Sequence, residues 1–298
     1  MTTTEERPAP AAEPEFERRA ERAKAVRGFL QALPSYAYLV FFFAIPLLIV
    51  FVFSFASRSR TGKPVLSDWN LDSYAKLLQP VVAEIAARSL WLALLNTVLC
   101  LAIGYPFAYW LATRRSARYR AVLLVLVLIP FWSNFLVRTY AWRVLLGEHG
   151  FVTELGRALG LWDKLLFTQP AVFIGLLYGY LPFMVLPLYA ALERMDWSLV
   201  EAARDLYASG WTAFRKVTLP LSRPGVIAGS ILVFIPSLGA YVTPDILGGA
   251  KTTLLGNYIV RQFTAARNWP FGAALSFVVL VAMLIATIIY FRTDARTI

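Results

Sequence analysis

Six long apolar runs constrain the fold of this chain, because each run is long enough to cross a lipid bilayer. A membrane-spanning helix needs about 20 consecutive apolar residues, and only helices and closed barrels satisfy every backbone hydrogen bond inside lipid. The runs cover residues 36–57, 89–113, 121–142, 168–192, 224–244 and 268–291, and only the third carries a charge, Arg138. The sequence therefore predicts an all-α membrane protein with six transmembrane helices.

The composition agrees with this architecture and argues against several kinds of site. Charged residues make up 16% of the 298 residues, against about 25% in a typical soluble domain, and the mean hydropathy is +0.59. The one cysteine, Cys100, cannot form an intrachain disulfide. The one histidine, His149, leaves little room for a histidine-based metal site or a Ser-His-Asp catalytic device. We expect no metal site, no catalytic residues and no enzymatic activity.

The distribution of basic residues predicts how the chain crosses the membrane. With the N-terminus inside, the inner segments hold 17 of the 29 Lys and Arg residues, and the loops on the other side hold 10. The inner segments are 1–35, 114–120, 193–223 and 292–298. Cytoplasmic loops are enriched in Lys and Arg, so both termini should be cytoplasmic. The net charge of +11 then reflects membrane topology rather than binding of nucleic acid.

This topology divides the chain into three parts. A basic cytoplasmic tail covers residues 1–35, a six-span transmembrane domain covers 36–292, and a short cytoplasmic tail covers 293–298. A basic helix is expected near residues 15–32. The first apolar run has full membrane length and follows a long charged region, so it is predicted to be an uncleaved anchor rather than a signal peptide.

A charged segment between the fourth and fifth spans, residues 193–223, cannot lie in lipid and is predicted to be cytoplasmic. Ser198 and Glu201 have the spacing of a capping box, in which a serine caps a helix and a glutamate reaches back to the serine amide. Gly210 is expected to end this helix. Small and apolar residues share one face of it: Leu199, Ala202, Ala203 and Leu206. On periodicity alone, a solvated connector with a capped surface helix is an open alternative.

The same segment resembles the EAA loop of ABC importer permeases. That pattern has Glu-Ala-Ala, three residues, a glycine, nine residues, an aliphatic residue, any residue, and Leu-Pro. Here Glu201 opens the pattern and Leu219-Pro220 closes it at the expected distance, with Tyr207 at the glycine position. Leu219-Pro220 should also end a second short helix. The resemblance implies that a coupling helix docks on an ATPase subunit, with the site residues Ser198, Glu201, Ala202, Ala203, Leu206, Tyr207, Gly210, Leu219 and Pro220.

Further stretches resemble the permeases of spermidine/putrescine-type ABC importers. They are FWSNFLVRTYAW (131–142), LGAYVTPDILGG (238–249) and NWPFGAALS (268–276), and the resemblance covers roughly residues 35–292. It implies a type I importer permease fold in the bacterial inner membrane. It also implies a second homologous permease, two ATPase subunits and an extracytoplasmic solute-binding protein. The cofactors implied, ATP and magnesium, belong to the ATPase and none is bound by this chain.

Asp245, at the outer end of the fifth span, is the candidate for attracting a cation. Just before it, Pro236, Gly239 and Tyr241 form a run that should break the helix and expose backbone carbonyls. Aromatic rings contribute about 0.5–2 kcal/mol each to binding a cation. The residues expected to line the path with Asp245 are Tyr241, Trp132, Tyr140 and, through its amide oxygen, Asn134. An aspartate after a proline is also a common turn cap, and that alternative stays open.

Two other features carry less weight. Arg138 lies toward the outer end of the third span and is expected to snorkel to the interface. The stretch GGAKTT (248–253) does not fit a phosphate-binding loop, because Asp245 and Ala250 occupy the glycine positions. An importer built on this chain would therefore take its ATP site from a partner.

The expected function is transport of polyamines or a related small cationic solute. The alternatives are an importer permease for another small solute, or a self-powered secondary transporter. A secondary transporter would show inverted repeats and acidic residues within its spans, and the sequence shows neither.

Overall fold

The computed structural model describes residues 15–59, 62, 64–249 and 252–294, which fall in two units, Met1–Phe53 and Ser54–Ile298. The first unit contains α1 (Glu15–Leu39), the π-helical turn η1 (Val40–Ala44) and most of α2 (Ile45–Ser54), which follow one another without a break. The helix therefore runs through the expected tail boundary at residue 35. The stretch Arg27–Ser54 is long and apolar enough to span a membrane.

The π-helical turn in this unit has a physical cause in Pro46. Proline inside an α-helix removes one hydrogen bond and clashes with the carbonyl four residues earlier. Immediately before it, the amide of Ile45 donates to the carbonyl of Val40 instead, which gives a wider turn. The same device recurs below, directly before Pro220.

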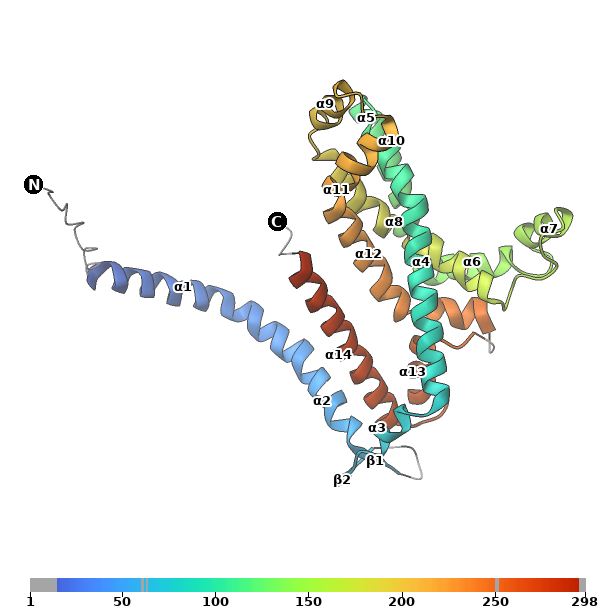
Figure 1. Ribbon diagram of the computed structural model, residues 1–298. Helices are drawn as coiled ribbons and strands as arrows, with labels where there is room; N and C mark the ends of the chain where they lie inside the picture. Colours follow the sequence, from blue (N-terminus) through green and yellow to red (C-terminus); the bar gives the residue numbers. More distant parts are fainter. Residues whose placement is uncertain (1–14, 60–61, 63, 250–251, 295–298) are drawn as a thin grey trace, which may run out of the picture. The chain divides into compact units, whose positions relative to one another are not determined.

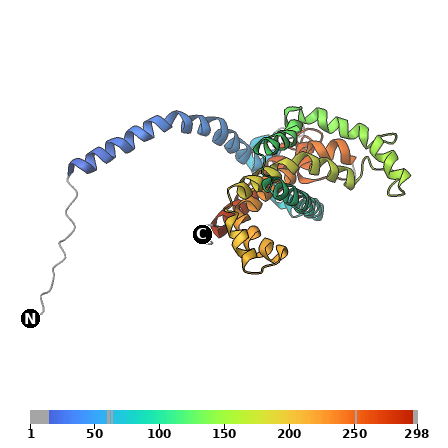
Figure 2. The same cartoon turned by 90° about the horizontal axis from the view of Figure 1, so that it is seen from above.

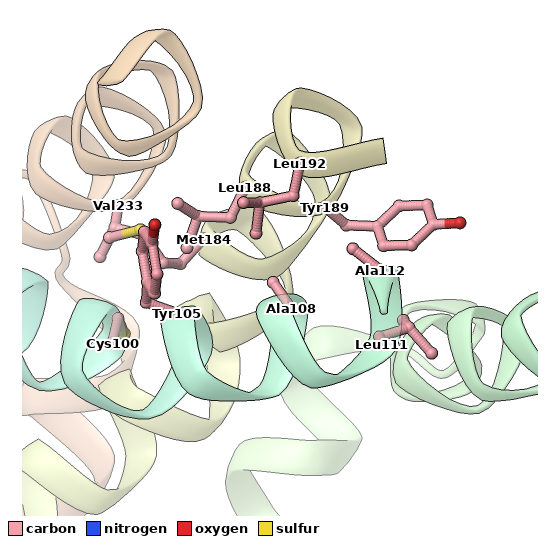
Figure 3. Packing of buried hydrophobic residues seen from close by; sticks show 10 residues of the cluster. All are labelled: Cys100, Tyr105, Ala108, Leu111, Ala112, Met184, Leu188, Tyr189, Leu192 and Val233. Atoms are coloured by element: carbon pink, nitrogen blue, oxygen red, sulfur yellow. The ribbon is translucent and has the colours of Figure 1, made fainter. Parts of the chain in front are cut away.

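Three long helices form the core of the second unit: α4 (Pro80–Ala112), α8 (Gln169–Glu193) and α12 (Arg223–Leu238) (Figure 1). Figure 3 shows the side chains that they bury together, which are Cys100, Tyr105, Ala108, Leu111, Ala112, Met184, Leu188, Tyr189, Leu192 and Val233. A Cβ on Gly225 would lie 2.6 Å from the Cβ of Ala191, and one on Gly229 would lie 2.7 Å from the Sδ of Met184. These two glycines therefore let α12 approach α8 closely within one chain.

Near the Pro80 end of α4 lie α3 (Asp72–Leu77), α13 (Leu255–Phe263), the start of α14 (Trp269–Asp294) and a short hairpin (Figure 1). The helix α14 packs against α3 and α13. A short antiparallel hairpin joins β1 (Ala56–Arg58) to β2 (Pro64–Trp69), and the guanidinium of Arg58 donates to the carbonyl of Ala266 at 2.7 Å. The all-α prediction is correct for the described residues apart from this hairpin.

The six predicted spans correspond to four long apolar helices and two bent pairs. The helices are Arg27–Ser54, Pro80–Ala112, Gln169–Glu193 and Trp269–Ile288. In one bent pair, Gly210–Leu221 and Arg223–Leu238 meet at 65°. In the other, α5 (Ala117–Trp132) and α6 (Phe135–Leu145) meet at 91°. The predicted third span, 121–142, therefore corresponds to two helices with a sharp bend between them rather than to one continuous helix.

The sharp bend of the third span lies at Ser133 and Asn134. Ser133 is extended, with φ −86° and ψ 147°, so the helix stops there. Asn134 then starts α6, because its Oδ1 accepts a hydrogen bond from the amide of Leu136 at 2.8 Å. In both views, α6 and the following α7 (Phe151–Ala158) project to one side of the three core helices (Figure 1 and Figure 2).

Candidate functional site

The segment 193–223 folds as a compact helical cap at the Ala112 end of α4. It contains α9 (Ser198–Asp205), α10 (Gly210–Ala213), the π-helical turn η2 (Phe214–Thr218) and α11 (Leu219–Leu221). Aromatic rings attach it to the core. The ring centroid of Tyr109 lies 5.9 Å from those of Trp197 and Phe214, and the ring centroid of Tyr105 lies 5.6 Å from that of Phe214. Such ring pairs add to the energy of burial. The cap is thus packed against α4 rather than loosely tethered.

The start of α9 differs from the predicted capping box. Ser198 is already helical, and the N-cap position belongs to Trp197, which makes no side-chain cap. The carboxylate of Asp196 accepts from the amide of Ser198 at 3.0 Å and so serves the helix end instead. Hydrogen bonds from the Ser198 side chain and amide lower the pKa of Asp196. The helix begins one residue earlier than expected, which leaves Glu201 on the exposed surface with no capping role.

The end of α9 also differs from the prediction. The amide of Ala208 donates to the carbonyl of Ala203, and the amide of Tyr207 donates to that of Arg204, which is the hydrogen-bond pattern of a Schellman motif. Tyr207 has φ +61°, the left-handed conformation in which glycine is favoured. Gly210 does not end the helix but is the first residue of α10. Tyr207 thus stands at the glycine position of the EAA pattern and has the backbone conformation that favours glycine.

The outward surface of α9 is apolar and open. Leu199 is 46% exposed, Leu206 82% and Tyr207 99%, and Ala202 is exposed between them. We call these four residues the exposed tip. Of the predicted apolar face, only Ala203 turns inward, where it packs against the cluster of Met195, Val200 and Ala213. An apolar, glutamate-edged surface that nothing in the described chain covers fits contact with another protein.

Leu219-Pro220 was predicted to end a short helix, and this prediction is wrong. The amide of Leu219 donates to the carbonyl of Phe214, so a π-helical turn precedes Pro220 and the helix continues to Leu221. The chain then bends into α12 at Ser222, which is fully buried. Its hydroxyl lies 2.7 Å from the hydroxyl of Tyr105 on α4.

At the other end of α12, the predicted helix break is present. The helix ends at Leu238, and the hydroxyl of Tyr180 donates to the carbonyl of Pro236 at 3.2 Å. The carbonyls of Gly239 and Ala240 lie against Gly256, where an added Cβ would come within 2.5 Å of the Gly239 oxygen. The two carbonyls, which the sequence predicted to be exposed, thus lie close to the start of α13, where Gly239 remains exposed and Ala240 is buried.

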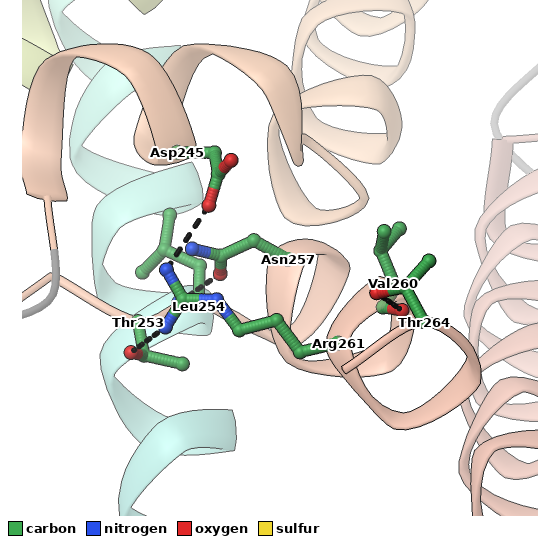
Figure 4. A network of polar contacts seen from close by, with 7 residues as sticks. All are labelled: Asp245, Thr253, Leu254, Asn257, Val260, Arg261 and Thr264. Atoms are coloured by element: carbon green, nitrogen blue, oxygen red, sulfur yellow. Dashed lines mark hydrogen bonds and ion pairs between the residues drawn. The ribbon is translucent and has the colours of Figure 1, made fainter. Parts of the chain in front are cut away.

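Asp245 lies in the π-helical turn η3 (Pro244–Gly248) and forms an ion pair. The Nη2 of Arg261, on α13, lies 3.0 Å from its Oδ1, and the Nη1 of Arg261 donates to the Oγ1 of Thr253 at 3.4 Å (Figure 4). The side chain of Asp245 is 56% exposed and that of Arg261 38% exposed. Nothing in the sequence pairs Arg261 with Asp245, because their spacing of 16 residues has no helical or strand period.

The other predicted path residues lie on neighbouring elements. Trp132 is 87% exposed at the end of α5, and Tyr140 on α6 and Tyr241 before η3 are each about half exposed. Because α6 packs against η3, Tyr140 and Asp245 belong to adjacent elements. The amide oxygen of Asn134, which was predicted to face a cation, accepts the hydrogen bond that caps α6.

Arg138 was expected to extend toward the membrane interface, but its side chain packs against two aromatic rings of the same chain. Its guanidinium carbon lies 5.5 Å from the ring centroid of Phe131 and 5.9 Å from that of Phe135. Its Nε and Nη1 are buried and have no hydrogen-bond partner within the described part of the chain. In the same part of the chain, no group of three or more His, Cys, Asp or Glu residues could hold a metal ion.

Comparison with known proteins gives consistent matches along most of the chain. Residues 104–298 match the family model described as binding-protein-dependent transport system inner membrane component. The spermidine/putrescine transport system permease protein PotB of Escherichia coli (strain K12) is 42% identical over 260 residues, covering 86% of this chain and 94% of that protein. PotB of Haemophilus influenzae is 41% identical over 262 residues, covering 87% and 91%.

Among solved structures, a bacterial alginate ABC transporter in complex with an alginate pentasaccharide-bound periplasmic protein contains a similar chain. The TM-score is 0.71 at 17% sequence identity, and the match covers 94% of this chain and 97% of that one. This likeness shows a shared fold.

Proposed function

Because this chain belongs to the family of binding-protein-dependent transport system inner membrane components, we propose that it is the permease subunit of an ATP-driven importer of spermidine, putrescine or related polyamines. The fold is that of a type I ABC importer permease, with two of its six candidate spans bent. The observation that supports the substrate class most directly is the 42% identity to PotB over 86% of the chain. That match is too extensive to reflect shared spans alone.

The subunit performs no covalent chemistry in this proposal. The exposed tip of α9, with Glu201 beside it, docks on an ATPase subunit that binds ATP and magnesium. When the ATPase moves, the tip moves with it. Ring contacts of Tyr105 and Tyr109 then pass the displacement to α4, and the bend at Ser222 passes it to α12. Because α12 packs tightly on α8, the core helices respond as a unit.

The remaining partners follow from the same assignment. A second, homologous permease completes the pathway, two ATPase subunits supply the energy, and an extracytoplasmic binding protein delivers the polyamine. The tip of α9 and both termini lie in the cytoplasm, and the Asp245 region faces outward.

Uptake by the reconstituted complex tests the proposal. Proteoliposomes that contain the permease pair and the ATPases receive the loaded binding protein outside and ATP inside. We expect accumulation of radiolabelled spermidine that requires ATP and survives ionophores that collapse ion gradients. Uptake that persists without ATP and stops with the ionophore would mean a secondary transporter.

Cysteine labelling tests the orientation, in a background without Cys100. Cysteines at Ser116 and Ala208 should react with an impermeant reagent only from the cytoplasmic side, and one at Asp163 only from outside. Reaction of position 208 from outside would place the segment 193–223 in the wrong compartment and contradict the assignment.

A further inference from the structure

The carboxylate of Asp245, which was expected to attract a cation, already pairs with a cationic side chain of the same protein. Arg261 reaches Asp245 from α13, with Nη2 to Oδ1 at 3.0 Å, while its Nη1 contacts Thr253. Figure 4 shows the guanidinium lying between the two partners. The charges of Asp245 and Arg261 cancel, so this pair presents little net negative charge to an approaching cation.

The ion pair is not what holds the surrounding backbone in place. Between the two charges the chain buries Leu247, Thr252, Leu254 and Asn257. Asn257 fixes the start of α13, because its Oδ1 accepts from the amide of Leu254 at 2.6 Å. The two charged side chains lie on the open side of this packed loop, 56% and 38% exposed. Arg261 can therefore leave Asp245 without unfolding the segment that carries either residue.

We infer that Arg261 is a specificity-determining residue, a tethered competitor that reserves Asp245 for ligands with more than one positive charge. The inference rests on the proposed function. A tethered group acts at an effective concentration in the millimolar range. A free monovalent cation below that concentration rarely displaces Arg261 from Asp245, because it carries the same single charge as the guanidinium.

A polyamine can win this exchange because it brings additional ammonium groups. Once its first ammonium takes the place of Arg261 on Asp245, a second can contact the ring of Tyr241. The amide of Asp245 donates to the Tyr241 carbonyl, so Tyr241 precedes Asp245 by one turn, the spacing at which two side chains can meet. Tyr241 is 50% exposed, and an ammonium over a tyrosine face gains a cation–π contact. The second contact thus favours the polyamine, and competition from Arg261 weakens the binding of monovalent cations to Asp245.

The test compares polyamine and monoamine in the reconstituted complex. Spermidine uptake is measured at rising concentrations of n-butylamine, a monovalent probe, for the wild type, Arg261→Gln and Arg261→Lys. Arg261→Gln should lower the half-inhibitory butylamine concentration by about twofold to fivefold, the range set by the usual strength of an exposed ion pair. Arg261→Lys keeps the tethered charge and should behave like the wild type. Arg157→Gln is the matched control, because the guanidinium of Arg157 donates to the carbonyl of Asp163 rather than to a carboxylate.

A double mutant separates exchange from a structural role. If Arg261 acts through Asp245, adding Arg261→Gln to Asp245→Asn should change butylamine inhibition no further. If the ion pair has only a structural role, Arg261→Gln should lower the midpoint of thermal unfolding and the uptake rate, while butylamine inhibition stays at the wild-type value. That outcome would overturn the inference. A wild-type complex that takes up no spermidine at all contradicts the proposed function, and this inference with it.

Discussion

The hydroxyl of Tyr105 on α4 lies 2.7 Å from the hydroxyl of Ser222, at the bend where the segment 193–223 leads into α12. Both side chains are buried, and 117 residues separate them along the chain. The bond is thus a polar link between two core helices and the segment proposed to contact the ATPase. Its removal should affect coupling more than folding.

Tyr105→Phe should preserve insertion and lower coupling. The ring contact with Phe214 stays, and Ser222 is left with its second bond, to the carbonyl of Leu219, so the loss of stability should be near 1 kcal/mol. The measurement is spermidine transported per ATP hydrolysed, beside thermal unfolding in detergent. Ser222→Ala should act on the same link, so the double mutant should show no further loss of coupling. Fully additive losses would contradict a shared role.

Tyr207→Gly should raise stability and retain transport. The left-handed backbone costs a non-glycine residue about 1–2 kcal/mol, and the extra freedom of glycine in the unfolded chain returns about 0.5–1 kcal/mol. The net gain should therefore lie between about 0 and about 1.5 kcal/mol, measured by thermal unfolding. Tyr207→Val is the matched control and should destabilise, because a β-branched side chain fits this conformation worst. Loss of transport in a stabilised Tyr207→Gly protein would give the ring itself a docking role.

Glu201→Gln should weaken coupling while α9 stays folded. The helix end is served by Asp196 rather than by Glu201, so the substitution removes a charge from the docking surface without removing a cap. A charge-assisted contact with the ATPase implies a loss of about tenfold in substrate-stimulated ATP hydrolysis. Asp205→Asn, on the same helix, is the control. Full activity of Glu201→Gln would rule out a charged contact at this position.

Gly225→Ala should destabilise the core, whereas Gly179→Ala should not. The added methyl at position 225 would lie 2.6 Å from the Cβ of Ala191 and 2.8 Å from the carbonyl of Pro187. Overpacking of this kind costs about 1–3 kcal/mol. At Gly179 nothing lies within 4 Å of the added carbon. Thermal unfolding of the two variants in one detergent checks the difference, and equal midpoints would mean that α12 does not pack on α8 as described.

The sequence alone determined the all-helical architecture, the apolar stretches behind the candidate spans and the place of the charged segment 193–223 between the fourth and fifth of them. These features are local: a helix in lipid satisfies its own backbone hydrogen bonds, so length and apolarity are enough to predict one. The break after Pro236 was predictable for the same reason, since proline and glycine act within one or two turns.

The tertiary structure decided how the ends of these helices are used. Asp196 takes the role predicted for Ser198, and Asn134 caps α6 instead of offering its oxygen to a cation. Arg261 pairs with Asp245, 16 residues away, and Tyr105 meets Ser222. The caps made by Asp196 and Asn134 are local, between residues two apart, and aspartate and asparagine are preferred at such positions. The contacts of Arg261 with Asp245 and of Tyr105 with Ser222 follow from no residue type or period, because they depend on where the packing of other helices brings a side chain. A buried or half-buried polar group then takes whichever partner that packing supplies.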